Sequence, residues 1–546
     1  MTNSLVRYAV AAAMTAAAAG AAHATSLSSY AANQQAGLNV NVYISGSTAV
    51  DNTIASELNT ASLNICQSGT VTAYTAANKV LDASGNAIGG AKEYIYYCQA
   101  GTSSGVATNK FLAVFKESTA GSINGAQPLI EVAKGQTSPL TFLSPTGPDV
   151  LAGTCASGAD TGCTTADFQQ HVVPTGGVAD VEANLLRTVP GGGTLSSNDI
   201  STFLSGAPGL DVVWGVAVTK NLFYALQVAE HLTDGTVAGC TTTSNDSPAC
   251  APSLSKAQVA SLLLGANNSN GANLLSWNQI AGLNNTSDNN VYICRRDVGS
   301  GTEASFEAYF LGARCSSSSE AMSNQDGQFT IESASTGNLL KCLQAFDQGG
   351  ISITPYNQDF NTSYPPFTPA GNQWAIGITS TELKSTDLSG HGDAFRMVAI
   401  DGVLPTLANV VNGYYPYFST DSWYTVKSGS NVPSGDPLAA FKAIQGDIGH
   451  PVPTEAADAN YTNRPWGSGG DLAPASLFAT SNNAGYTTFP VTTAEVEANP
   501  INVFGKASSG AVDNCDTPVL SGNVNTGLTQ TTSPEGVLIG SKNVNQ

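Results

Sequence analysis

The sequence predicts an α/β protein with largely parallel sheets, and two observations support this prediction. Residues 39–60 and 291–312 repeat one pattern, in which alternating apolar residues typical of a strand lead into a Gly/Ser/Thr turn and then a helix-like segment. Further strand-like runs alternate with helix-like segments along the chain. The length of 546 residues is enough for two substantial lobes with large cores.

The first copy of this pattern begins with a strand. Residues 40–44 alternate apolar and polar side chains, and Gly46-Ser47-Thr48 forms the turn that follows. Ile54 and Leu58 are then spaced for one face of a helix.

The second copy reads VYICRRDVGSGT over residues 291–302, and aromatic residues at helical spacing follow it. Ser300 and Glu303 fit a capping box at the start of the predicted helix. Arg295 and Arg296 are neighbours in a strand, so they must face opposite ways and only one of them can face a given site. The alternative is a pair of surface arginines.

The remaining elements follow the same alternation. Strand-like runs lie at 111–115, 211–218, 395–401 and 423–426, and helix-like segments lie at 254–264 and 407–411. Segments rich in small polar residues, which we expect to be surface inserts, lie at 67–92, 152–165, 234–252 and 450–500. We expect a loosely ordered tail over residues 506–546.

The N-terminal segment 1–24 resembles a cleavable signal peptide. Arg7 precedes an Ala-rich apolar stretch, and Ala22-His23-Ala24 fits the small-x-small cleavage rule. The alternative is a short helix that is retained. Because no cysteine follows the stretch, we expect a periplasmic or secreted protein without a lipid anchor.

The charge of the chain disfavours two classes of partner. The formal net charge is −20 and only 11% of residues are charged, which disfavours nucleic acids and anionic membranes as partners. No later apolar run reaches the ~18 residues of a membrane span. A small anion is still compatible with this charge, because the field of distant charges is screened within about 10 Å.

The ten cysteines favour disulfides in an exported chain. Cys155/Cys163 and Cys240/Cys250 are close in sequence and are predicted to form local bridges, and Cys66/Cys98 is a plausible third pair. The other four cysteines can pair in three ways, and the sequence does not choose between them. Scattered histidines and the absence of CxxC predict no metal site, and we expect no cofactor.

Turns of this kind can bind an anion. The first N–H groups of a helix have no partner within the helix, and the helix dipole favours negative charge there. A guanidinium nearby adds a bidentate grip on an oxyanion. Taken alone, however, each turn could simply start a helix.

Taken in order, the segments resemble the periplasmic solute-binding proteins of phosphate ABC importers. The resemblance covers roughly residues 39–448 and rests on motifs whose order along the chain matches that family. These motifs are ISGSTAV at 44–50, KESTAGSING at 116–125, GVAD at 177–180, RDVGSGT at 296–302, WAIGITS at 374–380 and the DGVLP-to-YP stretch within 400–426.

The resemblance implies a two-lobed periplasmic-binding-protein fold of type 2, with the ligand between the lobes. The expected first lobe is discontinuous, over 39–212 and 416–505, and the second lobe covers 213–415. The implied role is capture of phosphate or a similar oxyanion by a monomer, without catalysis, with an ABC permease as the candidate partner.

The resemblance also implies ten ligand-binding residues, at positions that match the family motifs: Ser47, Thr48, Ala49, Gly121, Ser122, Asp180, Arg296, Ser300, Gly301 and Thr302. Arg296 is the expected cationic clamp. Asp180 is the expected acceptor of the proton on hydrogen phosphate, a role that sulfate cannot fill because it has no proton to donate. The alternative for Asp180 is a residue of a surface turn. Val298 stands where many members have an acidic residue.

Two other functions stay open at this point. A secreted phosphoesterase would need a base beside Ser300, and no histidine is positioned by sequence to serve. A structural or adhesive surface protein on the same scaffold is favoured by the polar inserts and the absence of a lipid anchor.

Overall fold

The computed structural model describes most of the chain between residues 26 and 530. The described ranges are 26–81, 87–118, 121–152, 167–186, 195–235, 237–240, 245–264, 276–283, 289–315, 330–357, 362–363, 365–477, 486, 488–506, 513–520 and 529–530. The predicted signal peptide and the Cys155/Cys163 pair lie outside these residues. In the described part, no helix is both long and apolar enough to span a bilayer.

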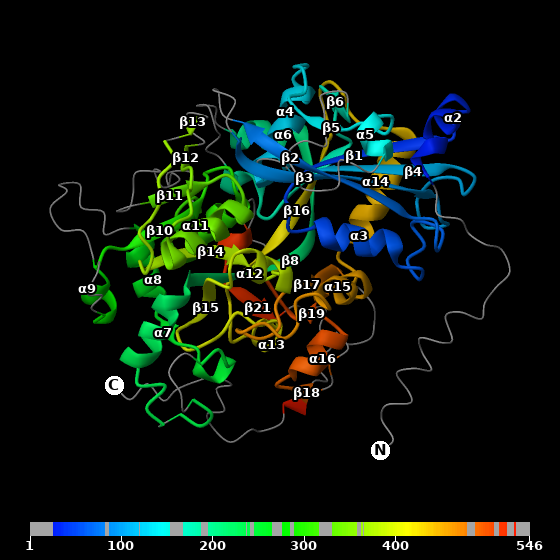
Figure 1. Ribbon diagram of the computed structural model, residues 1–546. Helices are drawn as coiled ribbons and strands as arrows, with labels where there is room; N and C mark the ends of the chain where they lie inside the picture. The colour runs from blue at the N-terminus through cyan, green and yellow to red at the C-terminus, as the bar shows by residue number, and fades with distance from the viewer. Residues whose placement is uncertain are drawn as a thin grey trace.

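The predicted α/β class is confirmed. Helices surround a twisted sheet whose central path has the strand order β11-β10-β14-β8-β16-β7-β1-β4-β3-β2 (Figure 1). The expectation of largely parallel sheets is only partly right, because parallel pairs around β1 and β10 are joined by antiparallel pairs of β8 and β16.

The first half of the sheet is built around β1, which pairs in parallel with β4 and β7. Its strands are β1 (Asn39–Gly46), β2 (Thr72–Leu81), β3 (Ala87–Gln99), β4 (Phe111–Glu117) and β7 (Gly176–Ala179), with a small pair β5 (Thr141–Leu143) and β6 (Phe168–Gln170). Its helices are α2 (Tyr30–Gln35), α3 (Asp51–Asn59), α4 (Gln127–Ala133), α5 (Pro148–Ala152), α6 (Ser197–Phe203) and α14 (Gly435–Asp447). Segment 67–92, predicted to be a surface insert, instead supplies β2 and part of β3; β3 pairs antiparallel with β4, and β2 pairs antiparallel with β3 at the edge of the sheet.

Two long strands connect the halves of the sheet. The first part of β8 (Leu204–Thr219) pairs with β16 (Phe418–Val426), and its last part pairs with β14 and β15. β16 is buried along almost its whole length, and β8 is buried from Gly209 to Thr219, whereas residues 205–208 of β8 are mostly exposed. In Figure 1 they lie side by side between the two halves.

The second half of the sheet is built around β10 and β14. Its strands are β9 (Ser253–Leu254), β10 (Tyr292–Arg296), β11 (Thr330–Ser333), β14 (Ala375–Ser380) and β15 (Phe395–Ile400), with the pair β12 (Tyr356–Asn357) and β13 (Thr362–Ser363). Its helices are α7 (Lys220–Ala229), α8 (Lys256–Leu264), α9 (Trp277–Ala281), α10 (Gly301–Leu311), α11 (Thr336–Gln348) and α12 (Ser385–Gly390).

The C-terminal part lies against the crossing strands (Figure 1). Its elements are α13 (Leu407–Val411), α15 (Pro451–Asp458), β17 (Asp471–Pro474), β18 (Thr488–Phe489), α16 (Thr493–Ala498), β19 (Ile501–Asn502), β20 (Phe504–Lys506), β21 (Pro518–Leu520) and β22 (Thr529–Gln530). The prediction that 450–500 is only a surface insert is wrong, because β17 pairs with β8. Residues 513–520 also differ from a loosely ordered tail, since Asn514 Nδ2 donates to Glu182 and to the Thr420 carbonyl.

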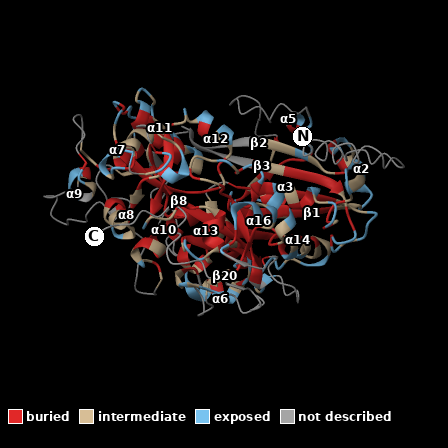
Figure 2. Ribbon diagram, turned by 90° about the horizontal axis from the view of Figure 1, so that it is seen from below, coloured by how far each residue is buried: buried red, intermediate tan, exposed pale blue. Residues whose placement is uncertain are grey.

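Buried residues run through the middle of the molecule, along the strands and the inner faces of the helices (Figure 2). Four tryptophans are fully buried there, namely Trp214, Trp277, Trp423 and Trp466. Trp214 lies on β8 and Trp423 on β16, so the crossing strands themselves contribute side chains to the core.

Disulfides bridge several parts of this core. The predicted Cys240–Cys250 and Cys66–Cys98 bonds are confirmed. The four cysteines that the sequence left open pair as Cys294–Cys342 and Cys315–Cys515. The last of these joins the C-terminal segment to the end of α10.

Candidate functional site

The first turn of the candidate site joins β1 to α3. Gly46 has φ +108°, and a Cβ there would lie 2.0 Å from the Val178 carbonyl oxygen, so the close approach of β1 and β7 requires glycine. The Ser47 N–H donates to that same carbonyl at 2.9 Å. The turn is therefore fixed against the end of β7, two residues before Asp180.

Lys116 braces this turn from β4, and the sequence reasoning did not select it. Its buried ammonium donates to the carbonyls of Gly46 at 3.0 Å and Ser47 at 2.8 Å and lies 3.1 Å from Asp51 Oδ1. A lysine directly after the apolar run FLAVF was the available signal, because a lysine is almost never fully buried unless it is paired. Lys116 thereby holds the turn in place through donors to two of its carbonyl oxygens.

The second loop is a 3-10 helix over Gly121–Gly125, and Ser122 is its buried hydroxyl. Ser122 Oγ donates to Asp180 Oδ2 at 2.9 Å and accepts the Asp180 N–H at 3.0 Å. The Ser47 hydroxyl donates to the other oxygen, Asp180 Oδ1. Two turns from distant parts of the chain thus meet on one carboxylate.

Asp180 itself is 6% exposed, so the alternative of a surface turn is wrong. Its backbone is held by the crossing strands, because Ser419 Oγ donates to the Asp180 carbonyl at 2.8 Å and Trp214 Nε1 donates to Ser419 Oγ at 2.8 Å. Burial raises the pKa of Asp180 above its usual value, although the serine hydrogen bonds and the charges of Arg296 and Lys116 act to lower it.

The GSGT turn closes the site from the other half of the sheet. A Cβ on Gly301 would lie 2.4 Å from Ser122 Oγ and 2.6 Å from Asp180 Oδ2, so glycine is needed for α10 to begin this close to the carboxylate. The Ile123 N–H donates to the Gly299 carbonyl at 3.0 Å, which joins the second loop directly to this turn.

The predicted capping box is wrong. Ser300 is at the N-cap of α10, but its side chain makes no capping hydrogen bond. Glu303 pairs instead with Arg295, whose Nη2 lies 2.6 Å from Glu303 Oε1. A buried arginine requires a carboxylate partner, and this requirement takes precedence over a helix cap.

Arg296 is buried at the end of β10, so the surface alternative is wrong for it. The guanidinium donates to three groups at the end of β11 and just beyond it: the Ser333 carbonyl at 3.0 Å, the Ala334 carbonyl at 3.1 Å and Thr336 Oγ1 at 3.2 Å. These bonds use three of its five N–H groups. A Cβ on Gly121 would lie 3.4 Å from Arg296 Nη2, so the guanidinium also borders the second loop.

Arg295 faces the opposite way, as expected for a strand, but it is buried and structural and does not lie on the surface. It pairs with Glu303, and Arg314 Nε pairs with Glu307 Oε2 at 2.6 Å. Burial raises the pKa of Glu303 to about 7, while the charge of Arg295 acts in the opposite direction. This four-charge network supports the start of α10 from behind.

Not every predicted residue faces the same centre. Thr48 is exposed, and Ala49 is buried with its N–H donating to Ser47 Oγ at 3.0 Å. The Ser300 N–H donates to the Asp297 carbonyl at 3.0 Å. The structure therefore brings Ser47, Ser122, Gly301 and Asp180 together, whereas Thr48 does not join them.

The arrangement has the chemistry of an anion-recognition site. It combines hydroxyl donors, one guanidinium, a helix N-terminus and one carboxylate that can accept a proton. Within the described residues, no group of three or more His, Cys, Asp or Glu side chains is close enough to hold a metal.

The comparisons with known proteins found no matching protein-family model and no match among curated proteins. Solved structures of low similarity include a Clostridium perfringens protein assigned as a phosphate ABC transporter substrate-binding protein with bound phosphate, at 13% identity and TM-score 0.35, covering 75% of this chain and 96% of that one. PstS from Borrelia burgdorferi has 10% identity and TM-score 0.30, covering 77% and 97%. An ABC-type phosphate transport receptor from Vibrio cholerae has 13% identity and TM-score 0.26, covering 50% and 74%.

Proposed function

We propose that this chain is an exported solute-binding protein that captures hydrogen phosphate, or a similar tetrahedral oxyanion, at the turns around Asp180. The convergence of Ser47, Ser122 and Gly301 on one buried carboxylate, with the Arg296 guanidinium at its border, supports this proposal most strongly. Donors and an acceptor from both halves of the sheet then surround one small volume.

Each group has a defined part in binding. Arg296 is held by three hydrogen bonds, so its remaining N–H groups are oriented before the anion arrives. The hydroxyls of Ser47 and Ser122 turn from Asp180 to the anion, and the first N–H groups of α10 add donors. Asp180 accepts the O–H of hydrogen phosphate.

Selectivity follows from the same carboxylate. An ionised Asp180 accepts but does not donate, so it binds an oxyanion that carries a proton and repels sulfate, which has none at neutral pH. Burial strengthens this discrimination because the charges inside are poorly screened by water.

Binding also requires movement. Ser47, Ser122 and Ser300 are almost fully buried in this structure, so an anion enters only when the two halves separate. We propose lobes over 39–212 with 416–505, and over 213–415, that open about β8 and β16. In this proposal the monomeric protein carries out no catalysis and delivers its ligand to an ABC permease.

Calorimetry of the mature chain with phosphate, arsenate, sulfate and molybdate tests the proposal. We expect phosphate to bind and sulfate not to bind at the same concentration. Arg296→Lys keeps the positive charge but loses the guanidinium group that can donate two parallel N–H bonds to an oxyanion, so it should weaken phosphate binding. The matched control is Arg396→Lys, which makes the same change at a buried arginine paired with Asp246 and Asp393. Ser122→Ala is a second, smaller change at the site. If no oxyanion binds, or if phosphate and sulfate bind equally, the proposal is wrong.

A further inference from the structure

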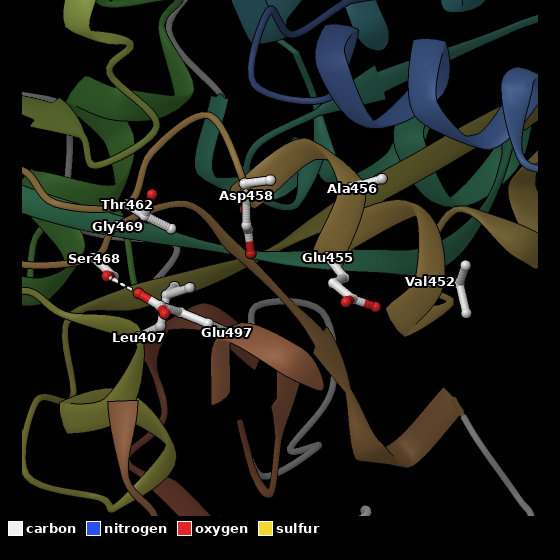
Figure 3. A pocket seen from close by; sticks show the side chains of 10 residues that line it. Leu407, Val452, Glu455, Ala456, Asp458, Thr462, Ser468, Gly469 and Glu497 are labelled. Carbon is white, nitrogen blue, oxygen red and sulfur yellow. Dashed lines mark hydrogen bonds between the residues drawn. The ribbon is translucent and has the colours of Figure 1, made fainter. Parts of the chain in front are cut away.

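A pocket of about 480 Å³ lies in the C-terminal part and is lined by other residues than those around Asp180 (Figure 3). It lies between α15, the segment that follows this helix, α13 and α16. Its apolar lining comes from Leu407, Val452, Ala456 and Ala459. A volume of this size is within the range of roughly 300–1,000 Å³ typical of small-molecule sites.

Three carboxylates line the same pocket. Glu455 and Asp458 come from α15, and Glu497 comes from α16. The Ser468 hydroxyl donates to Glu497 Oε1. The described residues that line the pocket include no lysine or arginine, so the pocket has the opposite charge preference from the site around Asp180.

The buried carboxylate of Asp458 indicates that the pocket has a ligand. Its side chain extends from α15 toward the space between Glu455 and Glu497 (Figure 3). It is 3% exposed, and its Oδ1 accepts the Asp471 N–H at 3.0 Å. Its Oδ2 has no hydrogen-bond partner among the described residues. A buried acceptor without a donor costs free energy, and a ligand with an N–H group would remove that cost.

The surroundings of Asp458 disfavour its negative charge in the unliganded protein. Burial and the neighbouring carboxylate Asp471 raise the pKa of Asp458 well above its usual value. A positively charged group in the pocket would compensate both effects.

We propose that this pocket binds a small organic cation with a primary ammonium group on an aliphatic body. The ammonium group has three donors and no acceptor, which matches Asp458 Oδ2 and the carboxylates on either side of it. The aliphatic body packs against Leu407, Val452 and the two alanines. This proposal uses none of the residues of the proposed oxyanion site.

The test is calorimetry of the mature full-length chain with pentylamine, 1,5-diaminopentane and 1-pentanol. We expect at least one amine to bind at least tenfold more tightly than the alcohol, which has the same body without the charge. Glu497→Gln and Asp458→Asn should each weaken amine binding at least tenfold. The matched control Glu131→Gln alters a glutamate of α4 whose carboxylate accepts from Gln127, and it should leave amine affinity unchanged.

Several outcomes would overturn the proposal. These are equal binding of pentanol and pentylamine, no binding of any amine at millimolar concentration, and unchanged amine affinity in both pocket variants. Binding of Mg²⁺ or Ca²⁺ without any amine would also overturn it. Thermal unfolding shows whether Asp458→Asn folds. If it does not, the amine affinities of Glu497→Gln and Glu455→Gln test the proposal instead, because neither glutamate is buried and both variants should fold.

Discussion

The Ser122 hydroxyl lies 2.9 Å from the Asp180 carboxylate, although 58 positions separate the two residues along the chain. The same hydroxyl accepts the Asp180 N–H, so two hydrogen bonds of opposite direction join Ser122 to Asp180. A second serine, Ser47, binds the other carboxylate oxygen from 133 positions away. Asp180 is thus the residue on which two of the predicted turns converge.

Asp180→Asn should reduce the discrimination between phosphate and sulfate. The amide removes the negative charge that repels sulfate, and it weakens the acceptor for the O–H of hydrogen phosphate. A hydrogen bond to a charged group contributes about 1.5–3 kcal/mol, so phosphate affinity should fall roughly 10- to 100-fold. Sulfate affinity should rise, and calorimetry with both anions measures the ratio.

A matched control for this variant is Asp347→Asn. Asp347 lies on α11, is also buried and accepts the Asn221 N–H at 2.8 Å. The Asp347→Asn variant should leave the ratio of phosphate affinity to sulfate affinity unchanged. A ratio that is the same in Asp180→Asn and in the wild type would remove Asp180 from the site.

Gly301→Ala should weaken oxyanion binding. The added Cβ would lie 2.4 Å from Ser122 Oγ, so α10 or the serine must shift. Overpacking of this kind costs about 1–3 kcal/mol. Gly446→Ala in α14 is the matched control, since its Cβ meets nothing within 4 Å and a helix gains up to about 1 kcal/mol from alanine. Thermal unfolding and phosphate titration of both variants separate the loss of packing from the loss of binding.

The sequence was informative where local patterns determine structure. The strand–turn–helix at Gly46 and the helix start at Ser300 were predictable, because apolar spacing and glycine turns depend on nearby residues. The order of the motifs also pointed to Asp180 and Ser122 as members of one site. Nothing local indicated that Thr48 would face solvent.

The misses have one physical origin, which is pairing across long distances in the chain. Glu303 was assigned to a helix cap because its partner Arg295 was not recognisable as buried. Lys116 was missed because its carbonyl partners lie in another turn. The Cys315–Cys515 bond, with a separation of 200 residues, could not be chosen from sequence because loop closure leaves no local pattern.

Removal of this long-range disulfide should destabilise the protein more than removal of a short one. In the chain-entropy account, closing a loop of 200 residues contributes about 5 kcal/mol and closing one of 10 residues about 3 kcal/mol. We expect the double variant Cys315→Ser/Cys515→Ser to unfold at a lower denaturant concentration than Cys240→Ser/Cys250→Ser. Proteolysis near residue 515 should also be faster. Equal midpoints for the two variants would contradict this order.

Stability should fall as pH rises from about 4.5 to 7. Burial raises the pKa of Glu303 to about 7 and that of Asp211 to about 6, so the folded state holds protons that the unfolded state releases. The stabilisation is complete below the pKa values of the unfolded state. It is lost as pH rises through the pKa values of the folded state, by at most about 1.4 kcal/mol for each group and each pH unit. The pKa values of His391 and His450 are lowered by burial, which partly opposes this trend near pH 6.

Glu303→Gln tests the origin of this slope. The amide cannot titrate, so the change in unfolding free energy between pH 4.5 and 7 should be smaller than in the wild type, even though the variant is less stable because Arg295 loses its closest carboxylate. Denaturant unfolding at four pH values across this range provides the measurement. Glu131→Gln, which alters only a partly buried side chain, should keep the wild-type slope. A Glu303→Gln slope equal to that of the wild type would mean that the protonation of Glu303 does not change on unfolding in this range.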